Sequence, residues 1–200
     1  MKKIDWKMLL VTSNIFLIPL ILVFIYYGQL PDVLQTHFGM DNQVNGTSSK
    51  WMALIVTPVM VFLCHIFLCI MLDVTNSSRI PVIKLIKWIM PIILTFVTVS
   101  ILLANLGNQL DYRRLVVALL AGLYLVMGNY MPKDAAGVAG TQSLELRKKS
   151  AYLFIGGAIA LLISLFFEPF VSIVVLVFFT ISAIFWSLYC AYKGYKTYRS

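Results

Sequence analysis

The stretch "AYLFIGGAIALLISLFFEPFVSIVVLVFFTISAIFWSLYCAY", residues 151–192, is apolar almost from end to end. A single α-helix of this length would extend roughly 63 Å, about twice the thickness of the hydrocarbon core of a membrane. Glu168 and Pro169 lie near its middle. Proline disfavours helix in the residue before it, and a lone carboxylate is costly in lipid. We therefore expect two membrane-spanning helices that reverse direction at Glu168-Pro169.

The rest of the chain continues this pattern. Of its 200 residues, 60% are hydrophobic and only 12% are charged, whereas soluble domains carry about 25% charged residues. The first apolar run is longer than the core of a signal peptide, and no small-residue cleavage site follows it, so we interpret it as a span. Prolines at 19, 58 and 91 interrupt the first three spans. The predicted spans are residues 8–27, 52–72, 85–106, 115–131, 151–167 and 169–192.

The basic residues orient these six spans. The odd-numbered loops, residues 28–51, 107–114 and 168, contain Lys50, Arg113 and Arg114, and the other thirteen of the 16 basic residues lie in the tails and even-numbered loops. Excess Lys and Arg marks the cytoplasmic side of a membrane. The sequence thus predicts an all-α membrane protein, a six-transmembrane-helix bundle forming one membrane domain over residues 1–200. Both termini are expected in the cytoplasm, with loop 28–51 outside and loop 132–150 inside.

Loop 28–51 is the longest polar segment outside the cytoplasm, and its residues favour a small structured extracellular cap. Residues 33–38 suit a short strand or a helical turn. Gly39 and Asn45-Gly46 are turn signals, and Asn-Gly favours a tight hairpin reversal. Ser48 or Ser49 is placed to cap the second span, because a serine oxygen accepts an amide hydrogen at a helix start.

The spans offer few residues for chemistry. The chain has two histidines, and we interpret His65, in the middle of the second span, as a packed residue satisfied by a helical carbonyl or an Asn. Asp73 lies about two turns later, at the cytoplasmic end. The three cysteines fall in apolar runs and behave as small hydrophobic residues.

Motifs of hydrolases, zinc sites and phosphate-binding loops are absent from the sequence, so we expect no enzyme activity, no metal and no cofactor. The basic residues form no patch, which indicates contact with membrane lipid and not with nucleic acid.

Two polar segments together resemble a known family. "LPDVLQTHFGMDNQVNGTSSKW", residues 30–51, follows the first predicted span, and "GNYMPK", residues 128–133, ends a later one. They are similar to the two signatures of the SdpI-type immunity proteins: a Pro, then Thr-His-Phe, a turn with Gly and a Ser-Lys before the second helix, and a second signature on the inner side. Six spans in about 200 residues fit that family as well.

The resemblance implies a bacterial cytoplasmic-membrane protein that protects its cell from a secreted peptide toxin. In the family's best-known member, the protein also sequesters a cytoplasmic repressor when the toxin is present. The outer signature falls on Pro31, Thr36, His37, Phe38, Gly46, Ser49 and Lys50. The inner signature falls on Gly128, Asn129, Pro132 and Lys133. The candidate site for a toxin or another partner is Pro31, Asp32, Thr36, His37, Phe38, Lys50 and Trp51.

Two observations keep other interpretations open. The family often continues after the inner signature with Gly-x-Arg-Thr-Pro-Trp, whereas residues 137–149 of this chain read "GVAGTQSLELRKK", which puts repressor capture in doubt. His37 is equally expected to hold the cap closed by a hydrogen bond. A transporter remains an alternative, and its mark would be polar groups aligned across the bundle. The second alternative is a membrane sensor or regulator that acts on a cytoplasmic partner.

Overall fold

The structure is a computed structural model that describes residues 4–39, 41–75, 81–133 and 143–199, with side chains described up to residue 193. The chain divides into two compact units, which we describe separately. Unit 1 contains residues 1–79 and 83–112, and unit 2 contains residues 80–82 and 113–200. The division leaves open whether the chain forms one membrane domain, and that stays a prediction.

Unit 1 contains four α-helices and a β-hairpin. The helices are α1 (Trp6–Asn14), α2 (Leu17–Tyr26), α3 (Thr57–Thr75) and α4 (Pro81–Asn105), with a 3₁₀ turn at Tyr27–Gln29 and a π-helical turn at Met52–Val56. Because α1 and α2 follow each other almost without a gap, they form one apolar helical stretch, as the first predicted span requires.

Prolines explain the irregular points of these helices. Pro19 lacks the N–H that would bond to the carbonyl of Ile15, and its ring clashes there, so the chain breaks between α1 and α2 at this position. Pro58 lies just after the π-helical turn, where the Thr57 hydroxyl donates to the Met52 carbonyl at 3.0 Å. Pro91 lies inside α4 without ending it.

The loop after α2 forms the hairpin. Strand β1 (Val33–Phe38) pairs antiparallel with β2 (Val44–Ser49). Of the two forms predicted for residues 33–38, a short strand or a helical turn, the structure has the strand. The predicted reversal at Asn45-Gly46 is wrong, because both residues lie within β2. The chain turns between Gly39 and Gln43, where Gly39 N–H donates to the Gln43 carbonyl at 2.8 Å and Asn42 adopts φ +60°. Asparagine tolerates this left-handed conformation better than most residues.

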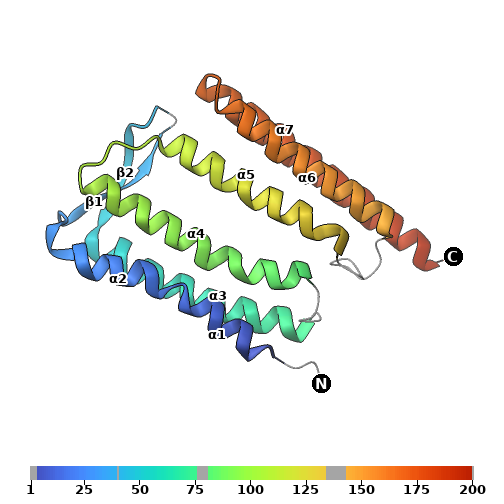
Figure 1. The fold of residues 1–200 in the computed structure, drawn as a ribbon, viewed down its shortest axis with the longest axis horizontal. Coiled ribbons are helices and arrows are strands. Elements are labelled where there is room, and N and C mark those ends of the chain that lie inside the picture. Colours follow the sequence, from blue (N-terminus) through green and yellow to red (C-terminus); the bar gives the residue numbers. More distant parts are fainter. Residues whose placement is uncertain (1–3, 40, 76–80, 134–142, 200) are drawn as a thin grey trace. The chain divides into compact units, whose positions relative to one another are not determined.

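Unit 2 consists mainly of three helices: α5 (Tyr112–Tyr130), followed by a 3₁₀ turn at Met131–Lys133, α6 (Leu144–Ser164) and α7 (Pro169–Arg199). The predicted reversal is confirmed, since Pro169 is the first residue of α7 and Val171 N–H donates to the Glu168 carbonyl at 2.9 Å. Helices α6 and α7 then pack side by side (Figure 1).

Five helical stretches of the described chain are long and apolar enough to cross a membrane, which supports a multi-pass membrane protein. They correspond to all predicted spans except 151–167. That span lies in α6, whose first two turns carry four charged residues, Glu145, Arg147, Lys148 and Lys149. Six spans, cytoplasmic termini and an extracellular cap therefore stay predictions.

Each unit has its own apolar core. In unit 1, Val23, Leu30, Leu34, Leu54, Ile101 and Leu102 pack together. This core includes Leu34 of the hairpin, whose side chain is fully buried. In unit 2, the core is Val117, Ala121, Ala158 and Leu161. The hairpin is thus part of the packed body of unit 1.

Candidate functional site

The hairpin is irregular where the outer signature lies. Gln35 pairs with Thr47 and His37 pairs with Gly46, so Thr36 is an extra residue on β1; Phe38 then pairs with Val44, which leaves Asn45 extra on β2. Such β-bulges bend a strand and redirect its side chains. The Thr-His-Phe segment therefore coincides with a local distortion of the sheet.

Thr36 and His37 form a small polar group on this distortion. The Thr36 hydroxyl lies 3.0 Å from His37 Nδ1 and 3.5 Å from the Gly46 carbonyl oxygen. A Cβ atom on Gly46 would lie 3.0 Å from the His37 Cβ, so any other residue there would press against the histidine. The His37 side chain stays exposed while its position is restricted from two sides.

Phe38 and the turn attach the hairpin to Tyr112, the last residue of unit 1. The Phe38 ring stacks on the Tyr112 ring with 3.7 Å between centroids and 11° between planes. The Tyr112 N–H donates to Asn42 Oδ1 at 2.9 Å. Phe38 is thus engaged within unit 1, and its role in recognition stays a prediction.

Asn105, the last residue of α4, attaches β1 to that helix. Its Oδ1 accepts from the Gln35 N–H at 2.9 Å, and its Nδ2 donates to the Gln35 carbonyl at 3.0 Å and to the Ile101 carbonyl at 2.8 Å. One side-chain amide thus forms hydrogen bonds with both the N–H and the C=O of Gln35, which a neighbouring strand would otherwise pair.

Lys50 stabilises the base of the hairpin. Its ammonium donates to the carbonyls of Leu30 at 2.9 Å and Tyr27 at 3.3 Å, and it lies 4.6 Å from the centre of the Tyr27 ring. The Asp32 carboxylate is 3.5 Å away. A cation at the carbonyl end of a helical segment is favourable. Lys50 therefore has a structural task, and a direct contact with a partner stays a prediction.

The remaining outer candidates are open to the surroundings. The Asp32 side chain is 99% exposed, Trp51 is 61% exposed, and Pro31 is exposed as well. After them, Ser49 caps the next helical stretch by accepting the Met52 N–H at 3.3 Å, which confirms the expected serine cap. Among the outer candidates, His37, Trp51, Pro31 and Asp32 present the most surface.

A groove of about 600 Å³ lies between the hairpin turn and the segment that joins α4 to α5. Its polar lining includes five side-chain amides, those of Gln35, Asn42, Gln43, Asn108 and Gln109. The rings of Phe38 and Tyr112 line it too. Among the described residues of this lining, Asp111 alone carries a charge.

The inner signature lies in unit 2, at the end of α5. Gly128 is where α6 comes closest, since a Cβ there would lie 2.7 Å from Ile155 Cγ1 and 3.0 Å from the Ala151 carbonyl oxygen. Lys133 lies 4.9 Å from the centre of the Tyr130 ring and donates to Asn129 Oδ1 at 3.5 Å. The Pro132 carbonyl accepts from Arg147 at 3.4 Å. Residues 134–142 of the predicted inner loop lie outside the described part of the chain.

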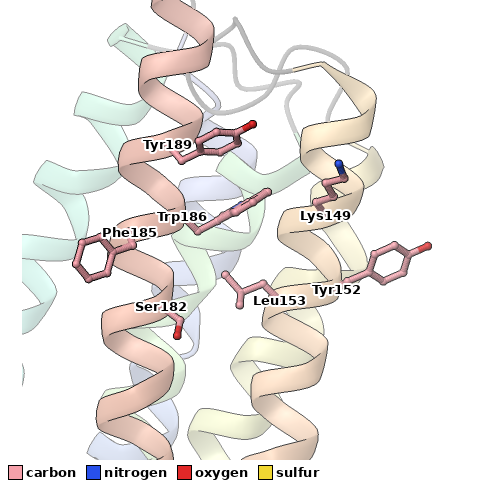
Figure 2. Close-up of a pocket in the computed structure, with 7 residues that line it drawn as sticks. All are labelled: Lys149, Tyr152, Leu153, Ser182, Phe185, Trp186 and Tyr189. Carbon is pink, nitrogen blue, oxygen red and sulfur yellow. The ribbon is translucent and has the colours of Figure 1, made fainter.

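A second groove of about 600 Å³ lies between α6 and α7 of unit 2 (Figure 2). Leu153 and Trp186 face each other across it, and Lys149 lies at one end. Trp186 Nε1 donates to the Ser150 hydroxyl at 2.7 Å, which holds the indole ring. This lining is largely apolar, and it contains Tyr189.

The structure also brings together residues that the sequence analysis treated separately. In unit 1, Lys87 Nζ lies 2.6 Å from Asp73 Oδ1, and both side chains are fully buried. The second Asp73 oxygen accepts the backbone N–H of Asp5 at 2.9 Å. His65, also fully buried, lies 3.0 Å from the Thr12 hydroxyl. The expectation that His65 is packed and satisfied is confirmed, with Thr12 as partner in place of a carbonyl or an Asn.

This buried cluster was hidden in the sequence for two reasons. Lys87 is one of the thirteen basic residues that the sequence places in the tails and even-numbered loops, although it lies more than one turn inside α4. The sequence predicts Asp73 at the cytoplasmic end of its helix. The available signal was spacing: His65, Cys69 and Asp73 follow one another at intervals of four, which places them on one face of α3.

Comparison with known proteins gives one match. Residues 15–62 match the family described as a domain of unknown function, DUF1648. The match covers α2, the hairpin and the start of α3. No curated protein and no solved structure matches the chain.

Proposed function

We propose that the protein is a non-enzymatic immunity protein or receptor of the SdpI type, in the cytoplasmic membrane of a bacterium, that protects its cell from a secreted antimicrobial peptide. One observation carries the proposal. The polar loop of a chain otherwise dominated by apolar helices is an ordered hairpin, attached to its unit by Leu34, Asn105, Lys50 and Phe38, and still exposing His37.

The way in which the hairpin is held supports a recognition role. A loop that served only as a connection would need neither the Asn105 bonds nor the stacked rings. Side chains that are fixed before a partner arrives lose less entropy on binding. His37 is such a side chain, and Trp51 at the hairpin's base adds a large exposed ring, a residue type enriched in binding hot spots.

The charge distribution supports the placement. With six spans and both termini in the cytoplasm, thirteen of the 16 basic residues face the cytoplasm and the hairpin faces outward. A peptide secreted by the same or a neighbouring cell then meets the hairpin first. Binding of a cytoplasmic repressor is a separate proposal, located at Asn129, Pro132 and Lys133, and a pull-down with the intact protein tests it.

The test uses a bacterium that encodes this chain. A strain lacking the gene is grown beside its parent on agar, so that the parent supplies any secreted toxin. The deletion strain should show a zone of inhibition that plasmid-borne wild type removes. His37→Ala should restore little protection at equal membrane abundance, whereas Thr47→Ala, an exposed neighbour on β2, should protect fully. Absence of an inhibition zone argues against immunity, and full protection by His37→Ala removes His37 from the site.

A second candidate, a proton-coupled transporter, is favoured by the buried Asp73–Lys87 pair. Ionisable residues within apolar helices commonly mark ion or proton pathways. Asp73, Cys69 and His65 extend along one face of α3, and the Cys69 sulfur lies 3.6 Å from His65 Nε2. If this function is correct, proteoliposomes with a pH-sensitive dye inside should acidify faster than protein-free vesicles under an imposed potential. Asp73→Asn should abolish the difference; equal rates for wild-type and empty vesicles would contradict transport.

A further inference from the structure

The groove beside the hairpin turn has the lining of a binding site for a neutral, hydrogen-bonding ligand. Its volume of about 600 Å³ falls within the range of about 300–1,000 Å³ typical of ligand pockets. It lacks basic residues among the described residues that line it, so a phosphate or another anion would have no cationic partner there. A ligand rich in paired donors and acceptors fits this lining better.

Three of the amides are available to a ligand. The side chains of Gln35, Gln43 and Gln109 form no hydrogen bond within the described part of the chain. A glutamine amide offers donors on its nitrogen and an acceptor on its oxygen. A peptide group offers one N–H and one C=O, so each glutamine is able to form two complementary bonds with one peptide unit.

The hairpin already contains this type of pairing. Asn105 binds the N–H and the C=O of Gln35 with a single amide, at 2.9 and 3.0 Å. Gln35 itself lines the groove, as does Ala104, the neighbour of Asn105. The groove therefore lies next to a point where a side-chain amide and an extended backbone are paired.

Both sides of the groove are fixed in place. On one side, the turn is closed by the Gly39–Gln43 bond and joined to Tyr112 through Asn42. On the other, α4 is followed by Gly107 with φ +87°, where Asn108 N–H donates to the Leu103 carbonyl at 3.0 Å and Gly107 N–H to the Ala104 carbonyl at 3.2 Å. These two bonds are those of a Schellman helix end. A ligand would thus meet a groove that needs little ordering.

We propose that this groove binds the extended backbone of an uncharged peptide segment. Gln35, Gln43 and Gln109 pair with its peptide groups, and the Phe38–Tyr112 rings contact one apolar side chain. The Tyr112 hydroxyl is buried and has no hydrogen-bond partner within the described residues, so among the polar groups of the groove only the exposed amides are offered to the peptide. The inference rests on the proposed function, because it assigns the bound peptide to the toxin that the hairpin meets.

Binding is tested with the full chain in lipid nanodiscs and the blocked peptide acetyl-Ala-Val-Ala-Val-Ala-amide as probe. Losing one bond of about 0.5–1.5 kcal/mol at each of two glutamines corresponds to roughly a fivefold to hundredfold change in affinity. The double variant Gln43→Ala/Gln109→Ala should therefore weaken binding about tenfold, and Thr47→Ala should not change it. A probe with methylated backbone nitrogens should lose binding, because it keeps the apolar side chains but lacks the N–H donors.

Three results would overturn the proposal: no saturable binding of the blocked peptide, equal binding of the methylated probe, or an unchanged affinity of the double variant. Tighter binding of an N-acetylglucosamine disaccharide than of the peptide would assign the groove to carbohydrate instead.

The plate assay separates this inference from the proposed function. If Gln43→Ala/Gln109→Ala protects fully while His37→Ala does not, the immunity function is supported and the groove is not needed for it. If the nanodiscs bind the peptide and the deletion strain shows no inhibition, the groove stands and immunity fails.

Discussion

The two units bury different kinds of contact. In unit 1, polar side chains join elements far apart in the sequence: Lys87 with Asp73, Thr12 with His65, and Asn105 with Gln35. In unit 2, buried hydroxyl groups form short bonds, as between Ser164 and Ser172 and between Trp186 and Ser150, while small residues let helices approach and rings fill the space between them. Gly128 faces Ile155, Gly157 faces the Phe179 ring, and Phe179 lies 4.7 Å from the Tyr124 ring.

This difference bears on what each unit is suited for. Within lipid, helices gain no hydrophobic energy by associating, so packing and hydrogen bonds hold them together. Close packing tolerates many apolar substitutions of similar volume. A buried ion pair tolerates almost none, because removing one partner leaves an uncompensated charge. Unit 1 therefore has the more specific arrangement, and it is also the unit that holds the hairpin.

The largest effect is expected from breaking the buried pair. Lys87→Met should lower the free energy of unfolding by about 3–5 kcal/mol, since Asp73 stays buried without its cation. The double variant Lys87→Met/Asp73→Leu should recover most of the loss, because no charge is left to compensate. Both are measured by titration of the detergent-solubilised protein with SDS. A single variant as stable as wild type would mean that the pair contributes nothing to unit 1.

A smaller effect is expected at the glycines of α6. Gly157→Ala places a methyl group against the Phe179 ring, and overpacking of this kind costs about 1–3 kcal/mol. Gly156→Ala is the matched control, because nothing lies within 4 Å of its new Cβ. That variant should be neutral or slightly stabilising, since alanine favours helix over glycine. Equal melting temperatures for the two variants would contradict close packing of α6 and α7.

A local effect is expected at the hairpin. Asn105→Leu removes both bonds to Gln35 while keeping a side chain of similar size, which corresponds to about 1–2 kcal/mol. Exchange of the Gln35 amide hydrogen should therefore become about five to thirty times faster, as followed by NMR or mass spectrometry. Thr47→Ala serves as control. If exchange at Gln35 is unchanged, Asn105 does not hold β1.

The smallest effect is expected at the exposed pair of α6. Lys149 lies 2.7 Å from Glu145, and this hydrogen bond lowers the pKa of Glu145 and raises the pKa of Lys149. A carboxyl group whose pKa is lower in the folded than in the unfolded protein stabilises the fold at pH values above its unfolded pKa. This stabilisation is lost as the pH falls through the folded pKa. The contribution should thus disappear below about pH 4. Because both side chains face solvent, Glu145→Gln should leave the melting temperature at pH 7 unchanged. A clear drop would show that this pair is shielded from solvent.

Several features of the chain were accessible from local sequence. Helix length and the break at Pro169 follow from hydropathy and the geometry of proline, which depend only on neighbouring residues. The strand at 33–38 and the serine cap at Ser49 are local in the same sense. The turn was misplaced because Asn45-Gly46 is only a preference, and the pairing of His37 with Gly46 placed both residues within the strand.

The sequence by itself determined a chain of apolar helices with a polar hairpin-forming loop after the first helical stretch, because hydropathy and turn chemistry act over a few residues. Only the tertiary structure decided which polar groups meet. Asp5, Asp73 and Lys87 come from three different segments, and Asn105 is far along the chain from Gln35. Spacing shows which face of a helix a residue occupies, but not which helix that face will meet. The same holds for the groove, since its two sides lie about 70 residues apart, as Asn42 and Tyr112 show.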